Sequence, residues 1–501
     1  MSPSYTIIRG GRLVDVARHE APPTDILIEG DTILEVGAPG LAAPAEATVV
    51  DAAGMLLHPG LINAHTHGHG NLAKGMGDRW SLELLLTAAP WIGGGRELED
   101  KYLTTLIGAA EMLTKGCTAC YDLSFEFPSP TVDGMAACAK AYRDAGLRAV
   151  LAPMVADTTL FEAIPGLMDA LPPALQKDAE SYRLAPTETT LQRIREIVRG
   201  FDVDRDLVRP AVAPTIPHHC TTAFLEGCRD IAREHGLGLH SHVAEGKVQA
   251  IAGRKLYGST LLQHMDALGL VGPDFVVAHG VWLDDEDMRR LAFHGGSVAH
   301  NPGSNALLGS GIADARRMLE LGVNLAIGTD GANCCDNQNM YESLRTASYV
   351  SHVKSPDTER WLATSEILRA ATEGSAKALG FPNLGRIAPG FKADIVFVDL
   401  GTINWLPFND PVNQLVHTED GTGVHSVMVG GAFKLRDRKL VDVDLAKLAT
   451  EAEHARERLA RINAERKEVF RRLAPVVNSY CPGLAYAPYH VHRYGAPLAP
   501  G

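Results

Sequence analysis

The sequence predicts an α/β protein built from a (β/α)8 TIM barrel and a composite β-sandwich domain that draws on both N- and C-terminal segments. Two observations favour this fold. Apolar strand-like runs alternate with helical segments after residue 67, as is typical of βαβ units in a parallel sheet. Short β-branched runs broken by Gly and Pro flank this region on both sides. Eight strand-like runs, the number a (β/α)8 barrel requires, end near His67, Asp122, Val155, Pro214, His242, His279, His300 and Asp330.

The first three of four expected segments build the two domains. Residues 1–58 form the first part of the sandwich, and residues 59–383 form the barrel. Helical segments are expected between the barrel strands and after the last one, at residues 98–115, 135–145, 224–235, 284–293, 314–321, 339–350 and 364–379. Residues 384–440 return to β character, with strands expected at 385–399 and 424–431 and a tight Pro-Gly turn. We expect these strands to join the N-terminal ones.

The fourth segment, residues 441–501, is expected to be a helix followed by a tail. Residues 444–473 are rich in charge and carry i, i+4 pairs such as Glu457 and Arg461, which predicts a helix with a solvated face. Residues 474–501 are rich in Pro, Tyr and Gly and carry little charge. The tail is therefore expected to dock on a protein surface, such as that of a second subunit, in a homodimer or a higher homo-oligomer.

Composition excludes several classes of partner. The chain of 501 residues has 47 basic and 60 acidic residues and a net charge of -13, with no Lys/Arg stripe that could follow a phosphate backbone, so nucleic acid is not expected. No run of about 18 apolar residues is present, so no membrane span is expected, and we predict a cytoplasmic protein. The eight cysteines are expected to be reduced, and Cys117 and Cys120 are interpreted as strand residues because no second Cys pair completes a zinc site.

Polar residues close four of the predicted strands. His65 and His67 are spaced i, i+2 and share one face of a strand. Strand five offers His242, or His240 on the same face. Strand six ends in His279, and strand eight ends in Asp330. One such residue is ordinarily a hydrogen-bonded core residue, but a barrel gathers its strand ends at one mouth. Imidazoles with a carboxylate suit zinc, iron or manganese.

The same motifs resemble the amidohydrolase superfamily. They are PGLINAHTH at 59–67, HVAE at 242–245, AHG at 278–280, HNPGSN at 300–305 and GTDG at 328–331. The chain is most similar to the branch that holds cytosine, guanine and S-adenosylhomocysteine deaminases together with the triazine hydrolases. The resemblance runs from about residue 5 to residue 431 and implies a (β/α)8 barrel with a composite β-sandwich, in agreement with the expectation from the sequence pattern.

The resemblance also implies roles for particular residues. The metal ligands would be His65, His67, His242 and Asp330; Glu245 would be the proton shuttle, His279 would orient water or substrate, and Asp330 would accept the proton of the attacking water. Binuclear relatives carry a bridging lysine at the end of strand four, where this chain reads VAPTIPHHC at 212–220. We therefore expect one divalent metal per chain, with zinc as the first choice and iron as the alternative.

Substrate contacts are expected from the loops that follow the strands. The candidates are Asn71, Trp80, Thr215, His218, Asn305 and Asn333. Related deaminases place a substrate-binding histidine where this chain has Thr215, and His218 follows it. His69 is interpreted as an ordinary loop histidine, while His300 and Asn301 are expected to hold the strand-seven loop.

These features predict a hydrolase that uses metal-bound hydroxide to attack a ring C–N bond of a small molecule. The first reading is hydrolytic deamination of a nitrogen heterocycle. A second keeps the site and changes the leaving group, giving dechlorination or N-dealkylation of a triazine-like ring, or hydrolysis of an amide. A third is an inactive scaffold protein, which the presence of all four ligand residues and Glu245 disfavours.

Overall fold

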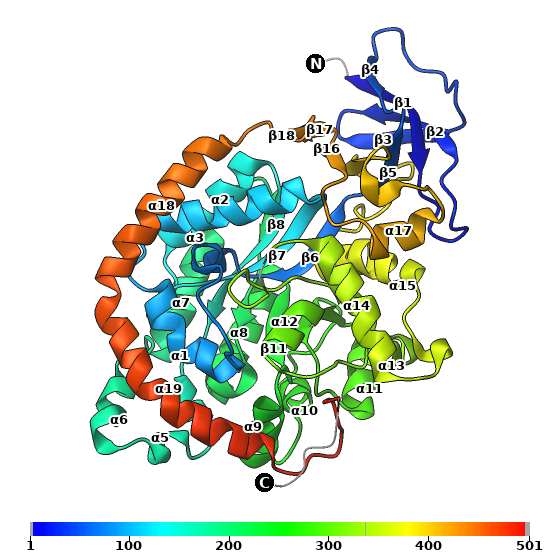
Figure 1. Cartoon of the computed structure of the whole chain (residues 1–501). Coiled ribbons are helices and arrows are strands. Elements are labelled where there is room, and N and C mark those ends of the chain that lie inside the picture. Colours follow the sequence, from blue (N-terminus) through cyan, green and yellow to red (C-terminus); the bar gives the residue numbers. More distant parts are fainter. Residues whose placement is uncertain (1–3, 336, 496–501) are drawn as a thin grey trace.

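Two parallel sheets lie at the centre of the molecule (Figure 1). The computed structural model describes residues 4–335 and 337–495. One sheet has the order β10-β8-β7-β6, with β9 beside β8, and the other has the order β11-β12-β13-β14. The strands are β6 (Leu61–Thr66), β7 (Cys117–Phe125), β8 (Arg148–Val155), β9 (Val208–Pro210), β10 (Ala213–Pro214), β11 (Leu239–Val243), β12 (Phe275–His279), β13 (Ser297–His300) and β14 (Asn324–Ile327). They occupy all eight predicted strand positions, and the fourth is divided into β9 and β10.

The two parallel sheets contact each other at both edges. A parallel bridge joins Val212 to Leu239, and the His242 backbone N donates to Thr215 O at 2.8 Å. At the other edge the Asp330 N donates to His65 O at 2.9 Å. This α/β arrangement is consistent with the predicted barrel, and we refer to it as the barrel. The carboxyl ends of its strands, which form the mouth, bring together residues far apart in the sequence.

Helices separate the barrel strands along the chain. They are α1 (Leu82–Gly93), α2 (Leu98–Thr114), α3 (Val132–Ala145), α4 (Leu160–Ala163), α5 (Leu167–Ala170), α6 (Pro173–Glu180), α7 (Thr187–Arg199), α8 (Thr222–His235), α9 (Lys247–Tyr257), α10 (Leu261–Ala267), α11 (Asp285–His294), α12 (Pro302–Leu307), α13 (Ala315–Glu320), α14 (Met340–Lys354), α15 (Thr364–Arg369) and α16 (Ser375–Ala378).

The helix α8 illustrates why these segments fold as predicted. The Thr221 side chain accepts a hydrogen bond from Phe224 N, which caps the first turn, and Gly236 ends the helix with a φ of 61°. Between these signals, the buried residues recur at helical spacing: Phe224, Leu225, Cys228, Ile231 and Ala232. A capped amphipathic segment of this kind covers the sheet with its apolar face.

The strands at the two ends of the chain form a third sheet. It contains β1 (Tyr5–Leu13), β2 (Pro23–Glu29), β3 (Thr32–Gly37), β4 (Thr48–Asp51), β5 (Met55–Pro59), β15 (Ile395–Asp399), β16 (Val424–Val429), β17 (Ala432–Arg436) and β18 (Lys439–Leu440). The antiparallel pair β5–β15 joins the N-terminal and C-terminal strands, as expected. Its buried face includes Ile8, Ile26, Ile28, Leu57, Ile395 and Phe397.

The tight turn expected at Pro389 and Gly390 is confirmed, and Gly390 has a φ of 86°. The strand expected before this turn is wrong, because only Ile395–Asp399 is a strand. This turn lies against the end of β3, because Gly390 N donates to Ile33 O at 2.9 Å and Ile33 N donates to Phe391 O at 2.8 Å. The backbone groups are thus satisfied without a regular strand.

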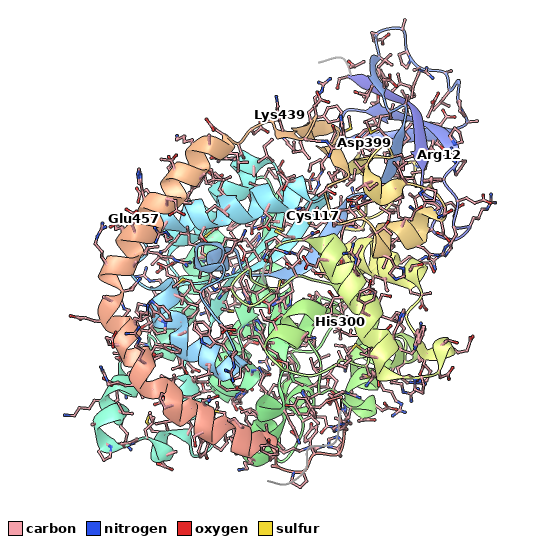
Figure 2. All side chains as sticks on the ribbon, in the orientation of Figure 1. Arg12, Cys117, His300, Asp399, Lys439 and Glu457 are labelled. Atoms are coloured by element: carbon pink, nitrogen blue, oxygen red, sulfur yellow. The ribbon has the colours of Figure 1, made fainter. Side chains whose placement is uncertain are left out.

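The C-terminal segment is more helical and more buried than predicted. After α17 (Pro411–His417) come α18 (Leu445–Ile462) and α19 (Ala464–Ala485), so the helical region ends twelve residues beyond the expected limit of residue 473. The predicted solvated face is confirmed on α18, where Glu457 lies at the outer edge of the molecule (Figure 2). On α19, however, Leu473, Val477 and Cys481 are buried at helical spacing. Their burial offsets the cost of two prolines inside the helix.

The tail docks on a protein surface, as expected, but residues 486–495 dock on the barrel of the same chain rather than leaving it. Arg493 is buried, and its side chain donates to the carbonyls of Val281 and Leu283. The expected tail also includes residues 496–501, which lie outside the described residues. Within the described part of the chain, no helix is long and apolar enough to cross a membrane.

Candidate active site

Backbone carbonyls hold His67 and His242, two histidines at the mouth, in one tautomer. His67 Nδ1 donates to Leu123 O at 2.8 Å, and His242 Nδ1 donates to Thr215 O at 2.7 Å. Each ring therefore keeps its proton on Nδ1 and presents the lone pair of Nε2. The two Nε2 atoms lie 3.2 Å apart. Two acceptors at this distance repel each other unless something positive lies between or beside them.

Asp330, three residues after the end of β14, completes this arrangement. Its Oδ1 lies 3.2 Å from His67 Nε2 and 3.5 Å from His65 Nε2. Ser304 Oγ donates to Oδ2 at 2.6 Å, and Gly331 N donates to Oδ1 at 2.7 Å. Burial alone would raise the pKa of Asp330, but the adjacent imidazoles hold that pKa well below its usual range. The carboxyl is therefore an anion at neutral pH.

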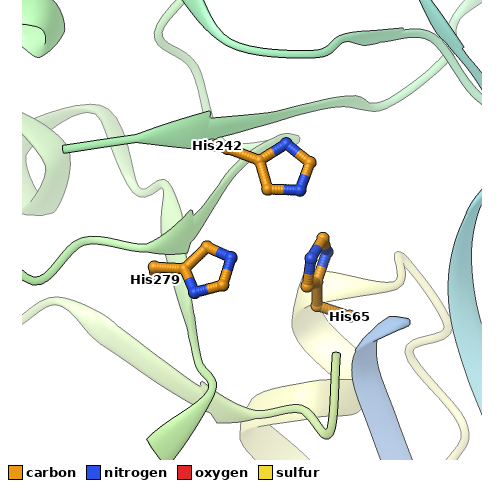
Figure 3. Close-up of side chains that lie close together, drawn as sticks. All are labelled: His65, His242 and His279. Atoms are coloured by element: carbon orange, nitrogen blue, oxygen red, sulfur yellow. The ribbon is translucent and has the colours of Figure 1, made fainter. Parts of the chain in front are cut away.

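The donor atoms fit a divalent metal ion. One nitrogen each of His65, His242 and His279 lie within 4.8 Å of one another, and so do one donor each of His65, His67 and Asp330. Figure 3 shows the rings of His65, His242 and His279 facing a common space. Neither nitrogen of the buried His65 ring has a hydrogen-bond partner among the described residues. Since buried polar atoms without partners are costly, a cation bound by these groups explains their arrangement.

Burial also suits the histidines to this task. It lowers the pKa of His65 to about 3 and that of His242 well below its usual value. Both rings are neutral at pH 7, which is the form that binds metals. The ring of His240, the alternative on strand five, lies 4.9 Å from the ring of His65 between centroids. Among the described residues, however, His240 is in neither of the two groups of donors that could hold a metal ion. The geometry favours His242.

Glu245 and His279 lie beside these donors. His279 Nε2 is 3.8 Å from Glu245 Oε1 and 3.7 Å from Asp330 Oδ2. His279 Nδ1 donates to Asn305 Oδ1 at 2.9 Å, which leaves Nε2 as an acceptor facing the centre. Burial, followed by the negative charge of Asp330, raises the pKa of Glu245 well above its usual value. A raised pKa favours the protonated form of Glu245, which is the form that can act as an acid.

The backbone of the mouth is strained at three of these positions. Ala244, His279 and Asp330 have φ angles of 54°, 69° and 68°, in the left-handed region that residues with a Cβ rarely adopt. Each such residue costs on the order of 1–3 kcal/mol and persists only when its surroundings hold it in place. All three are a ligand candidate, a catalytic candidate or the neighbour of one.

Two of the predicted substrate-binding residues hold histidines of the site, and a third lies in a turn after β10. Thr215 holds His242 through its backbone carbonyl, and Asn305 holds His279 through its side chain. His218 is buried in a short turn after β10, with its Nδ1 lacking a partner among the described residues. Contact with a substrate therefore stays a prediction for these residues, and for Asn305 the structure adds a positioning role.

The other three predicted substrate-binding residues make contacts farther along the loops. Asn71 Nδ2 donates to Gly68 O at 2.9 Å and packs against α2. Trp80 packs edge-on against Trp91 and against Phe470 of α19. Asn333 lies against Gly70, and its buried Oδ1 has no partner among the described residues.

Two interpretations of loop histidines have different outcomes. His69 behaves as an ordinary loop residue, because its Nδ1 accepts a hydrogen bond from Phe125 N at 3.2 Å. The expectation that His300 helps to hold the strand-seven loop stays a prediction. The backbone O of His300 accepts from Gly328 N at 3.0 Å, while both ring nitrogens are buried without a hydrogen-bond partner among the described residues.

Two residues that act on Glu245 were not predicted from the sequence. Gln249 on α9 donates to Glu245 Oε2 at 3.2 Å and accepts from Glu245 N at 3.1 Å, which fixes the acid. Glu83 in the first turn of α1 is buried, accepts a hydrogen bond from Ser81 Oγ, and forms no ion pair within the described residues. An acid in a first helical turn is common, so the sequence carried no signal for it.

A family model and sequence relatives both match this architecture. The model described as "Amidohydrolase family" matches residues 56–433. A 5'-deoxyadenosine deaminase from Methanosarcina mazei is 32% identical over 442 residues, which cover 88% of this chain and 94% of the relative. A 5-methylthioadenosine/S-adenosylhomocysteine deaminase from Thermococcus onnurineus is 32% identical over 87% of this chain and 95% of the relative.

Solved structures show the same likeness. An adenosine deaminase from Xanthomonas campestris with bound zinc has a TM-score of 0.80 and 28% identity, covering 91% of this chain and 98% of that protein. A variant of atrazine chlorohydrolase from Arthrobacter aurescens, in complex with zinc and atraton, has a TM-score of 0.81 and 25% identity. It covers 90% of this chain and 100% of that protein.

Proposed function

The chain belongs to the amidohydrolase family, and from that premise we propose that it is a zinc-dependent deaminase of adenosine-type nucleosides. Hydrolytic deamination of a nitrogen heterocycle is the activity of the enzyme. The finer statement, an adenosine carrying a modified 5' position, is supported by the names of relatives that are 32% identical over nearly nine tenths of the chain. The observation that carries the chemistry is the position of the buried Glu245, 3.8 Å from His279 Nε2 and beside the donor groups of the histidines and Asp330.

One divalent ion per chain is part of the proposal. His65, His67, His242 and Asp330 would hold it, and zinc is the first choice because zinc accompanies two similar structures. When bound, such an ion lowers the pKa of a coordinated water from about 15.7 to near 7 and so supplies a nucleophile at neutral pH. The proposal of a single ion rests on the absence of a lysine between Val212 and Cys220.

The side chains divide the proton transfers among them. Asp330, an anion, takes a proton from the attacking water, and His279 orients that water through the free lone pair of Nε2. Glu245 gives its proton to the ring nitrogen beside the attacked carbon. As the C–O bond forms and the C–N bond to the amino group breaks, the proton held by Asp330 goes to the leaving amine. The proton of the new hydroxyl returns to Glu245, so that one water gives a ring carbonyl and one ammonia. Positioned acids and bases of this kind contribute about 10²- to 10⁴-fold in rate.

Substrate choice is assigned to the loops around the mouth. Asn71, Trp80, Thr215, His218, Asn305 and Asn333 keep their proposed role in substrate binding. Glu83 joins them, because a buried carboxylate without a cation offers an acceptor to an N–H or O–H group of a ligand. We also propose that the two parallel sheets close as one (β/α)8 barrel and that the third sheet, of β1–β5 and β15–β18, folds as the family's sandwich. The enzyme is further proposed to be a cytoplasmic homo-oligomer.

A second candidate keeps the same site and changes the leaving group to chloride. The observation that favours it is the TM-score of 0.81 with an atrazine chlorohydrolase. Protonation by Glu245 would assist either leaving group, so the residues described above do not separate the two reactions.

The test is a panel of substrates assayed for ammonia and for chloride. It contains adenosine, 5'-deoxyadenosine, 5'-methylthioadenosine, S-adenosylhomocysteine, guanine, cytosine and atrazine. The proposal predicts that ammonia release is fastest with a 5'-modified adenosine, by at least about tenfold in kcat/KM, or 1.4 kcal/mol. Fastest turnover of atrazine with chloride release would support the second candidate, and a preference for a free base would overturn the nucleoside assignment.

A further inference from the structure

The C-terminal segment lies outside the part of the chain that the family model matches, yet it touches the loops that carry the active site. The model ends at residue 433, while Tyr489, Arg493 and Tyr494 pack against the loop that follows β12. We propose that residues 489–495 form a clasp that belongs to the catalytic scaffold, and that Arg493 is a positioning residue for His279. This inference deepens the proposed deaminase function and rests on it.

Arg493 anchors the clasp by direct contacts with the loop. Its Nε donates to Val281 O at 2.9 Å, and a terminal guanidinium nitrogen donates to Leu283 O at 2.7 Å. The other terminal nitrogen lies 3.4 Å from Asp314 Oδ2. The guanidinium is buried, with 8% of the residue exposed, and so its donors are spent on two backbone carbonyls and one carboxylate. Val281 is two residues from His279.

The backbone of the clasp approaches the strand-seven loop closely. Ile312 N donates to Arg493 O at 2.7 Å. A Cβ added at Gly311, whose φ is 116°, would lie 2.9 Å from that same carbonyl oxygen, so this approach requires glycine. Arg493, Tyr494 and Asn305 also share the wall of a cavity of about 150 Å³. The clasp therefore spans the loop of His279 and the loop of its partner Asn305.

Aromatic rings fill the space between the anchor points. The ring of Trp282, which is fully buried, lies edge-on to Tyr494 at 5.1 Å and to Tyr489 at 6.1 Å between centroids. His490 Nε2 lies 2.7 Å from Asp284 Oδ2 at the end of the same loop. Burial of this surface supplies an apolar contact that adds to the hydrogen bonds of Arg493.

Trp282 transmits the contact to both catalytic residues. Its backbone N donates to Ala244 O at 2.8 Å, next to Glu245, and its Nε1 donates to Ser310 O at 2.8 Å. Ser310 N in turn donates to Asn305 O at 2.9 Å. The loop that the clasp fixes thus adjoins Glu245 on one side and the holder of His279 on the other.

Backbone strain gives the clasp a task. His279 and Ala244 hold positive φ angles only because their neighbours over-determine them, and the loop from Val281 to Leu283 supplies those neighbours. Without the clasp the loop gains freedom, and His279 Nε2 departs from the position that orients the attacking water. Small displacements of a catalytic group reduce turnover more than they reduce substrate binding.

The experiment compares Arg493→Ala with Arg472→Ala in the full-length, metal-loaded enzyme. Arg472 is in the same C-terminal region, but it pairs with Asp178 on the surface and is half exposed, so its loss is the matched control. We expect Arg493→Ala to lower kcat by about 10- to 100-fold, the usual range for residues that orient catalytic groups. KM should change less than twofold, and metal content should stay equal to that of the wild type. Arg493→Lys, which retains one donor group, should recover part of the loss.

A double-mutant cycle separates positioning from simple destabilisation. If Arg493 acts through His279, the combined loss in Arg493→Ala with Asn305→Ala is smaller than the product of the two single losses, because both disturb the same group. Multiplying losses, or an unchanged kcat in Arg493→Ala, would overturn the proposal.

Hydrogen exchange provides a readout that does not depend on the substrate. The amides of residues 279–284 should exchange faster in Arg493→Ala than in the wild type or in Arg472→Ala. Equal exchange in all three would contradict the clasp. If the wild type releases no ammonia from any nucleoside while this exchange difference is present, the proposed function fails and the clasp stands.

Discussion

The two ends of the barrel strands bury polar groups in opposite ways. At the amino end of β8, Arg148 and Asp394 form an ion pair at 3.1 Å. A terminal nitrogen of Arg148 also donates to Asp206 O, and Gly430 N donates to the other oxygen of Asp394. At the mouth, ring nitrogens of His65 and His279 have no hydrogen-bond partner among the described residues. One end is complete within the protein, whereas the other requires a group that the protein does not supply.

The histidines make this contrast within one residue type. His58, near the amino end of β6, donates from Nδ1 to Pro59 O at 2.7 Å and accepts on Nε2 from the Tyr341 hydroxyl at 2.8 Å. Burial lowers its pKa to about 4, as it lowers that of His65 to about 3. Burial and a low pKa therefore do not distinguish a structural histidine from a ligand; a position within ligand distance of other metal-binding donors does.

The largest effect is expected from removing a ligand at the mouth. His242→Ala should abolish metal binding and lower kcat/KM by about 10³-fold or more, since a bound metal stabilises the transition state by several kcal/mol. The check is elemental analysis of the purified variant together with ammonia release. Metal content and activity near those of the wild type would remove His242 from the site.

The next effect separates proton transfer from metal binding. Glu245→Gln should keep the metal and lower kcat by about 10²- to 10⁴-fold, because the amide preserves the shape but not the acid. Single-turnover kinetics of the metal-loaded variant provide the measurement. Turnover within a factor of a few of the wild type would rule out Glu245 as the shuttle.

At the opposite end, a comparable free energy should appear as stability rather than activity. Asp394→Ala leaves the Arg148 charge buried without its partner and should reduce the free energy of unfolding by about 3–5 kcal/mol. The kcat of the folded fraction should be unchanged. Urea unfolding measures the first quantity and active-site titration the second.

The matched control is a solvent-exposed pair in the same sheet. Asp399 lies 2.9 Å from Arg438, with side chains about one third and two fifths exposed. Asp399→Ala should cost about 0–1 kcal/mol. A lower kcat in Asp394→Ala, at equal folded fraction, would show that the division between the two ends is not valid.

A smaller effect, dependent on pH, concerns a carboxyl outside both ends. Burial raises the pKa of Asp287 to about 7, although Thr260 Oγ1 donates to it. The folded state then binds this proton more tightly than the unfolded state, whose pKa is about 3.9, so stability is lost as pH rises from about 4 through about 7. Asp287→Asn removes this loss and should gain about 2 kcal/mol relative to the wild type between pH 5 and pH 8. Urea unfolding at pH 5 and at pH 8 measures this gain. An equal difference in the free energy of unfolding between Asp287→Asn and the wild type at the two pH values would contradict the raised pKa.

The strand ends of the barrel could be predicted because apolar runs and polar closures are local signals. The positions of His65, His67, His242 and His279 followed from them, and the mouth gathers these residues whatever the loop lengths. The choice between His240 and His242 needed the structure, since both point to the same face of β11.

The features that escaped prediction depend on contacts between distant segments. The helix is expected from the sequence to end at residue 473, before the segment rich in Pro, Tyr and Gly, but burial of Val477 and Cys481 against the barrel favours its continuation. Arg493 has no local pattern around it, and its role follows only from the loop it reaches about 210 residues earlier. Propensity and periodicity do not report such tertiary contacts.

Metal content across the two ends of the barrel tests the central claim most directly. Elemental analysis should find one divalent ion per chain in the wild type and in His58→Ala, and none in His242→Ala, because His242 is a proposed ligand at the mouth whereas both ring nitrogens of His58 bind groups within the protein. Two ions per chain in the wild type, or equal metal in His242→Ala and His58→Ala, would contradict the account.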